Sequence, residues 1–72
     1  MARYLRNDLR FDVAEINKRA EDAGVDSYLR VEGRNGYTAL DEHDRKTGKC
    51  FRNIECGTPK ECLNAAIIWG SN

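Results

Sequence analysis

Three cysteines and a single histidine are the side chains of this sequence best suited to bind a metal ion or attack a substrate. The cysteines are spaced six residues apart, at Cys50, Cys56 and Cys62. Zinc sites usually take cysteine ligands in close pairs, about two to four residues apart, so this spacing does not match a zinc pattern. If residues 50–56 form one strand, its two thiols lie roughly 20 Å apart on one face, too far for one ion to bridge. We therefore expect no metal site and no cofactor.

Cys56 and Cys62 flank Gly57, where a turn would bring their thiols within reach of each other. An odd number of cysteines in a chain without an export signal is nevertheless typical of free thiols in a reducing compartment. Free cysteine is often buried as a small apolar residue. We expect Cys62 to pack in the core, and a disulfide is the less favoured alternative.

His43 faces Cys50 if a four-residue loop at 45–48 joins the strands around it. A neighbouring imidazolium lowers the pKa of a thiol and can turn it into a nucleophile. The sequence offers this pair no obvious oxyanion donors and no third group, and a simpler interpretation is an exposed histidine in a charged loop. We therefore expect no catalytic residue and a protein that is not an enzyme. A thiol enzyme built on Cys50 and His43 is the least favoured of three hypotheses.

The closing stretch CGTPKECLNAAIIWG carries the signals of a capped helix. Thr58 can cap this helix, Pro59 suits its first position, and Glu61 completes a capping box. These signals predict a helix over about 59–69. Its main apolar stripe is Cys62, Leu63, Ala66 and Ile67, and the apolar residues off that stripe are Ala65, Ile68 and Trp69. A helix that is apolar nearly all round is buried on more than one side, so we expect this one to self-associate or to bind a partner.

The stretch FDVAEINKRAEDAGV predicts an earlier helix. Asp12 is a good N-cap, and Glu15 completes a capping box with it. Gly24 suits the left-handed position after the last turn. The helix is therefore predicted over about 13–23, and its apolar stripe is Val13, Ile16, Ala20 and Ala23.

The residues before this helix are less regular. Phe11 precedes the predicted cap and is expected to pack on Ile16 as a hydrophobic staple. Upstream, apolar residues stand at odd positions between charges, so residues 3–6 form either a short strand or an irregular arm.

Alternating segments on both sides of an Asn-Gly dipeptide at 35–36 predict a β-hairpin. A two-residue turn there places Val31 opposite Leu40, an apolar pair. The same register places Arg30 opposite Asp41, a pair of opposite charges, and both agreements support it.

A third strand is expected in KCFRNIEC, after the loop DRKTG. One residue more or less in that loop decides whether Phe51 or Ile54 points inward, and both registers stay open. The elements together predict a two-layer α+β domain. It has a three-stranded antiparallel meander with a helix before and a helix after it (α-β-β-β-α), and an extra N-terminal strand is left open.

The composition limits the classes of function. The 72 residues suffice for a single domain spanning 1–72, and twelve basic and twelve acidic side chains give a net charge of zero. Zero net charge disfavours non-specific binding to nucleic acid. No apolar run approaches the roughly 18 residues of a membrane span, and the N-terminus has no signal-peptide pattern. We therefore expect a cytoplasmic protein that does not bind membranes.

The order helix–strand–strand–strand–helix over residues 12–69 resembles the double-stranded-RNA-binding domain. That family grips phosphates through lysines at the start of its second helix, where PKECLNAA here supplies Lys60 beside Glu61. The resemblance implies nucleic-acid binding as the alternative function. The residues that would carry it are Arg45, Lys46, Lys49, Arg52 and Lys60.

The segments RYLRNDLRFDVAEINKR, GRNGYTALDEHD and FRNIECGTPKECLNAA are similar to those of small uncharacterised proteins encoded by phages and mobile elements of gut-type Firmicutes. The resemblance covers most of the chain and implies a genetic setting in a bacterial host, without a known activity. Small accessory proteins of phages often bind and disable a host protein, including proteins of defence or regulation.

A non-enzymatic protein-interaction module is therefore the first functional hypothesis, with a host protein or a second copy of the chain as partner. Exposed aromatic and arginine side chains dominate the energetics of interfaces. The residues expected to make these contacts are Tyr28, Arg30, Arg34, Tyr37 and Trp69.

Overall fold

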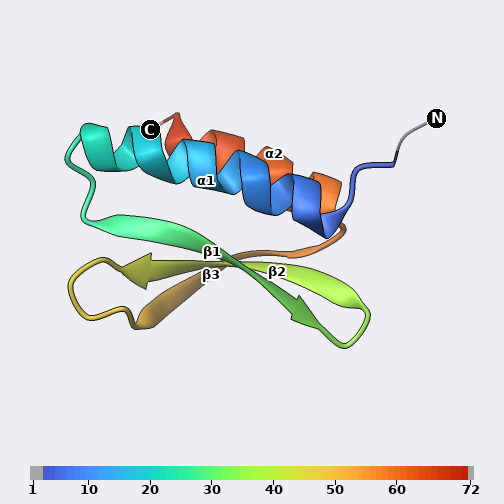
Figure 1. Ribbon diagram of the computed structural model, residues 1–72. Coiled ribbons are helices and arrows are strands. Elements are labelled where there is room, and N and C mark those ends of the chain that lie inside the picture. The colour runs from blue at the N-terminus through green and yellow to red at the C-terminus, as the bar shows by residue number, and fades with distance from the viewer. Residues whose placement is uncertain (1–2, 72) are drawn as a thin grey trace.

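Five elements form two layers in the computed structural model, which describes residues 3–71 (Figure 1). They are α1 (Arg6–Asp22), β1 (Ser27–Arg34), β2 (Tyr37–Asp44), β3 (Cys50–Gly57) and α2 (Pro59–Gly70). The sheet is antiparallel in the order β1-β2-β3, and both helices lie side by side on one of its faces. The predicted α-β-β-β-α order and the α+β class are confirmed.

α1 starts earlier than predicted, at Arg6 instead of residue 13. The strand considered for residues 3–6 does not form, because residues 3–5 belong to no strand and Arg6 is the first residue of α1. The carboxylate of Asp8 accepts the Leu5 N–H at 2.8 Å and so caps the first turn.

Burial of Leu9 explains the longer helix. Leu9 is fully buried and extends the stripe that continues through Val13. Burying a leucine stabilises by about 1.5–3 kcal/mol, more than the ~1 kcal/mol of an N-cap. Asp12 therefore lies inside α1, where it accepts a hydrogen bond from the Tyr4 hydroxyl at 2.6 Å. Phe11 is 71% exposed, so the predicted staple is wrong.

Two predicted glycine turns are confirmed. Gly24 has φ +84° and follows α1. Its N–H donates to the carbonyl oxygen of Glu21 at 3.0 Å, and the N–H of Val25 donates to the carbonyl oxygen of Ala20 at 2.9 Å. Gly36 has φ +79° in the turn between β1 and β2. Both positions require the left-handed backbone that glycine adopts without strain.

The first hairpin has the predicted register, with Val31 opposite Leu40 and Arg30 opposite Asp41. Arg30 nevertheless forms its ion pair with Glu32 on its own strand, at 3.0 Å between Nε and Oε1. Asp41 pairs with a different arginine, as described below.

The second hairpin settles the register that the sequence left open. His43 lies opposite Cys50, and two irregularities interrupt the pairing of β2 with β3. Ile54 packs against the core, whereas Phe51 is 58% exposed beside one irregularity. The bulges allow Ile54 to face inward without placing Phe51 in the core.

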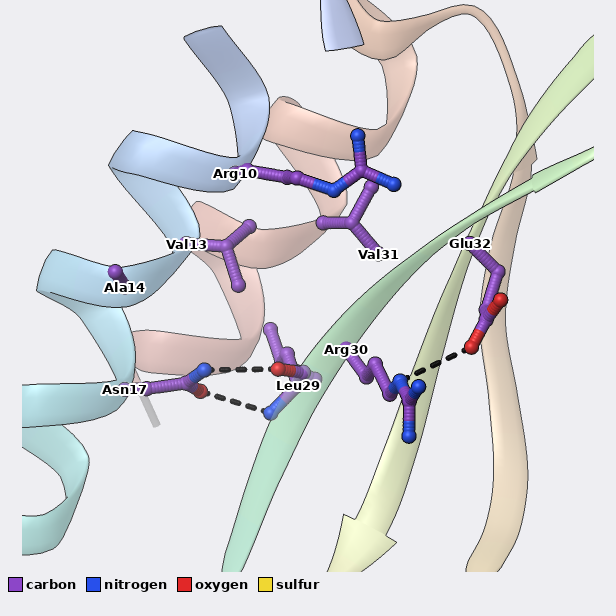
Figure 2. Close-up of a pocket in the computed structure, with 8 residues that line it drawn as sticks. All are labelled: Arg10, Val13, Ala14, Asn17, Leu29, Arg30, Val31 and Glu32. Atoms are coloured by element: carbon purple, nitrogen blue, oxygen red, sulfur yellow. Dashed lines mark hydrogen bonds and ion pairs between the residues drawn. The ribbon is translucent and has the colours of Figure 1, made fainter. Parts of the chain in front are cut away.

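Asn17 on α1 hydrogen-bonds the backbone of the edge strand β1. Its side-chain amide donates to the carbonyl oxygen of Leu29 and accepts the N–H of Leu29, both at 2.8 Å (Figure 2). β1 is an edge strand, so Asn17 bonds backbone groups that a further strand would otherwise use.

The core lies between the two helices and the sheet. Its buried residues are Leu9, Val13, Leu29, Val31, Leu40, Cys62 and Ala66. The prediction that Cys62 packs in the core is confirmed. Neither helix within residues 3–71 has the length and apolar character that crossing a membrane requires.

α2 packs on the core through Cys62, Leu63 and Ala66 as predicted, but its orientation differs from the prediction at Ile67. Ile67 was placed on the inward stripe but is 50% exposed, and Ile68 is 66% exposed. Ala65 and Trp69 were placed off that stripe but pack against the core. In this orientation the large side chain of Trp69 is partly covered, and its indole N–H hydrogen-bonds Glu42 in the sheet.

The capping box at the start of α2 is confirmed. The Thr58 hydroxyl oxygen accepts the Glu61 N–H at 3.2 Å, and the Glu61 carboxylate accepts the Thr58 N–H at 2.9 Å. The hydrogen bond from the Thr58 backbone lowers the pKa of Glu61 below its ordinary value.

Thr58→Ala should lower the free energy of unfolding by about 1 kcal/mol, because one of the two box hydrogen bonds is lost. In so small a domain this corresponds to a fall in melting temperature of roughly 4–8 °C. Thermal unfolding followed by circular dichroism measures it, with Thr58→Ser as the control that retains the hydroxyl. An unchanged melting temperature in Thr58→Ala would show that the box does not form.

Candidate functional site

The side of the sheet opposite the helices presents alternate residues of β1 and β2, and every third residue of β3, where two irregularities shift the pairing. Successive side chains of a strand point to opposite faces, and Leu29 and Val31 lie in the core. Figure 2 shows Arg30 and Glu32 directed away from α1. We call this surface the helix-free face, and its residues are Tyr28, Arg30, Glu32, Arg34, Tyr37, Ala39, Asp41, His43, Cys50, Asn53 and Cys56.

Four of the five residues predicted for partner binding lie together on the helix-free face: Tyr28, Arg30, Arg34 and Tyr37. Trp69 lies on α2, on the other side of the sheet, where it is half-buried. Its indole N–H donates to the carboxylate of Glu42 at 3.0 Å. The structure therefore groups four of these residues and separates the fifth from them.

Three polar residues of β2 are buried, although the sequence interpretation placed His43 in an exposed, charged loop. The exposed fractions of Asp41, Glu42 and His43 are 2%, 6% and 8%. β2 is the central strand, so neighbouring strands cover these side chains from both sides. The expectation that His43 is an exposed loop residue is wrong.

Asp41 is held by partners on both sides. Its Oδ2 lies 2.8 Å from a terminal nitrogen of Arg34, and its Oδ1 accepts the Asn53 side-chain amide at 2.8 Å. Arg34 keeps 47% of its side chain exposed. A guanidinium carries five N–H donors, so Arg34 can bind Asp41 and a further group at once.

His43 is also fixed on two sides. Its ring stacks on Tyr28 with 5.4 Å between centroids and 24° between planes. Its Nδ1 lies 3.0 Å from the carbonyl oxygen of Gly48, which can only accept. In the neutral imidazole, Nδ1 therefore carries the proton and Nε2 has the free lone pair.

The prediction that His43 lies opposite Cys50 is confirmed. Asp41 lies close to both as a third group. One potential ligand atom from each residue lies within 4.8 Å of the other two. Two members of this cluster are buried and Cys50 is exposed. The sequence interpretation missed Asp41 because its role depends on the pairing of the strands.

On the helix side of the sheet, Glu42 accepts hydrogen bonds from three side chains. The distances are 2.6 Å from Ser27, 3.0 Å from Trp69, and 2.6 and 3.0 Å from Arg52. Burial raises the pKa of Glu42, but the hydrogen bonds from Ser27, Trp69 and Arg52 together lower it below its ordinary value. This network ties the end of α2 to the central strand.

The basic residues expected for nucleic-acid binding are dispersed. Lys46 and Lys49 lie in the β2–β3 loop, at the opposite end of the domain from Lys60 at the start of α2 (Figure 1). Arg45 donates to the backbone carbonyl oxygens of Val25 and Ser27, and Arg52 belongs to the network on the helix side.

The three cysteines differ in environment. Cys62 is buried with its sulfur 3.5 Å from the carbonyl oxygen of Thr38, and burial raises the pKa of its thiol to about 11. Cys50 and Cys56 are exposed, and all three thiols are free.

An alkylating reagent should label Cys50 and Cys56 rapidly in reduced, chelator-treated protein, because the thiolate is the reactive form and both are accessible. Cys62 should react only when the protein unfolds. Peptide mass spectrometry over a time course measures the three rates, and addition of urea provides the control. Rapid labelling of Cys62 in the folded protein would contradict its place in the core.

Comparisons of the chain with protein-family models, curated proteins and solved structures give no match. The arrangement of the helix-free face, together with the expectations from the sequence, is therefore the basis on which a function can be argued.

Proposed function

We propose that the protein is a small non-enzymatic module that binds a partner protein through its helix-free face. The observation that carries this proposal is the grouping of Tyr28, Arg30, Arg34 and Tyr37 on one uncovered side of the sheet. Tyrosine and arginine are enriched among the residues that contribute most to binding at interfaces. They stand here on paired strands, so their backbone is already ordered before a partner arrives.

Contacts within the face hold two of these side chains in place. Arg34 is anchored by Asp41, and Tyr28 lies against His43 with the Arg45 guanidinium 5.9 Å from its ring centre. Ordering a flexible side chain on binding costs about 0.5–1.5 kcal/mol. Side chains that are ordered beforehand avoid part of this cost, which supports their use as anchors.

The charges of the face favour a protein partner over nucleic acid. Arg30 is paired with Glu32, and Arg34 with Asp41. Phosphate binding depends on a local excess of positive charge, whereas here each arginine has a carboxylate beside it. Nucleic-acid binding on a fold like the double-stranded-RNA-binding domain remains the alternative, and it would use the dispersed basic residues.

The size of the face implies that its rim takes part. Three strands of eight residues cover roughly 10–15 by 25 Å, less than the ~800 Å² that each partner buries in a typical stable interface. Phe51 is 58% exposed near the start of β3, an edge strand, and directly follows Cys50 in the sequence. A partner that also covers Phe51 gains apolar area at this rim.

The proposed setting rests on the resemblance to proteins of phages and mobile elements. We place the protein in the cytoplasm of a bacterial host, where it binds and disables a host protein of defence or regulation. Zero net charge means that the choice of partner depends on local contacts and not on overall charge.

The end of α2 is proposed as a second contact, for self-association. Ile67 and Ile68 are adjacent and are 50% and 66% exposed. Sedimentation velocity at several concentrations tests this contact, with Ile68→Ser as the variant. Concentration-dependent dimers that Ile68→Ser weakens would support it, and a monomer at every concentration would exclude it.

Affinity capture from a lysate of a Firmicutes host tests the main proposal. Arg30→Ala/Tyr37→Ala removes an arginine and an aromatic residue from the helix-free face. Arg10→Ala/Phe11→Ala removes the same two residue types from the exposed side of α1 and is the matched control.

We expect the wild type and the α1 control to capture the same protein and the face variant to lose it. Capture should persist after nuclease treatment and moderate salt. Loss of all capture with nuclease, together with a steep salt dependence, would favour the nucleic-acid alternative. Equal capture by both double variants would contradict the proposed face.

A further inference from the structure

The geometry points to a divalent metal site, best suited to Zn²⁺, formed by Asp41, His43 and Cys50. Carboxylate oxygen, imidazole nitrogen and thiolate sulfur are all ligands that zinc uses. One such atom from each residue lies within 4.8 Å of the other two. The expectation of no metal considered only the spacing of the cysteines, whereas this site needs one cysteine. The site does not depend on the proposed partner binding.

The sheet brings the three ligands together in a fixed way. Asp41 and His43 are two residues apart on β2, so their side chains share the helix-free face. Cys50 lies directly opposite His43 on β3. All three therefore belong to one hairpin, whose pairing sets their relative positions before any ion binds.

Neighbouring groups orient two of the ligands. The carbonyl oxygen of Gly48 binds the Nδ1–H of His43 and so leaves Nε2 as the nitrogen that can coordinate. Asn53 and Arg34 each bond one carboxylate oxygen of Asp41. Histidine ligands of metals commonly donate their other N–H to a carbonyl, and carboxylate ligands are commonly hydrogen-bonded as well.

A small movement of Cys50 completes the site. Ligand atoms around tetrahedral zinc lie roughly 3.3–3.8 Å apart, and the candidate atoms already lie within 4.8 Å of one another, so a contraction of at most about 1.5 Å suffices. Asp41 and His43 are buried and held, whereas Cys50 is exposed at the first position of β3. On binding, the Cys50 thiol gives its proton to solvent, and the thiolate together with the Asp41 carboxylate, which Arg34 shares, offsets the charge of the ion. Water takes the fourth position.

Titration with Co²⁺ tests the site in the reduced full-length chain. We expect a thiolate-to-cobalt charge-transfer band and the visible bands of tetrahedral coordination, both removed by excess Zn²⁺. Cys50→Ser should weaken binding by more than about tenfold, because loss of a second-shell partner alone costs roughly 10–100-fold. His43→Gln should do the same. Cys56→Ser, at the other exposed cysteine of the same strand, should bind as the wild type does.

Alkylation in the presence of Zn²⁺ gives a second readout that does not require a variant to fold. Zn²⁺ should slow the labelling of Cys50 and leave the rate at Cys56 unchanged. A missing charge-transfer band, or equal protection of both cysteines, would overturn the proposal. Equal loss of cobalt binding in Cys50→Ser and Cys56→Ser would also overturn it.

Discussion

Replacing Leu9 by alanine should lower the free energy of unfolding by roughly 3 kcal/mol, the typical cost of removing a buried leucine side chain. Leu9 is fully buried in the folded chain and belongs to the core between α1 and the sheet. A domain of this length has a total stability of only about 3–5 kcal/mol. Leu9→Ala should therefore be largely unfolded at modest urea concentrations.

Leu5→Ala is the matched control, because Leu5 stands just before α1 and is 54% exposed. Its melting temperature should stay close to that of the wild type, whereas that of Leu9→Ala should fall by more than about 10 °C. Equal, small effects of the two substitutions would show that the first turns of α1 do not pack on the core. The helix would then start near residue 13, as the capping signal suggested.

Glu42→Ala should cost roughly 2–3 kcal/mol, because it leaves the Trp69 indole N–H and the Ser27 hydroxyl without their acceptor. Arg52 contributes less to this cost, because its side chain is 58% exposed and water can hydrate the guanidinium once Glu42 is gone. Urea unfolding of the variant near neutral pH measures the effect. Glu32→Ala removes a more exposed carboxylate and should change stability by less than about 1 kcal/mol.

The same network predicts a loss of stability in acid. The pKa of Glu42 in the folded protein lies below its ordinary value of 4.5, so its contribution is complete above pH 4.5 and is lost as the pH falls through the folded value. The pKa values of Asp44 and Glu61 are lowered as well and act in the same direction. Glu42→Gln should therefore show a shallower fall in stability below pH 4.5 than the wild type. Parallel curves for the two proteins would contradict the role of Glu42.

Local signals in the sequence predicted the order of the elements and several of their ends. The Asn-Gly turn fixed the register of β1 and β2, and the box of Thr58 and Glu61 marked the start of α2. In these places the local preference agrees with the packing. At Asp12 it does not, because burial of Leu9 stabilises more than the cap would.

The candidate site was predictable only in part. The four residues of the helix-free face could be chosen by type, since tyrosine and arginine dominate interfaces. The burial of Asp41 and Glu42 could not, because it depends on side chains that other elements bring onto these carboxylates, such as Arg34 and Trp69. The orientation of α2, which directs Trp69 toward the sheet, likewise depends on Glu42, a residue of another element.

Site-specific photo-crosslinking tests the central claim, that the helix-free face is the binding surface. A benzophenone side chain placed at Tyr37, on the face, is compared with one placed at Phe11, on the exposed side of α1. In a host lysate the probe at Tyr37 should form one covalent adduct of defined mass, and the probe at Phe11 should form none. The same adduct from both positions, or an adduct from Phe11 alone, would contradict the account.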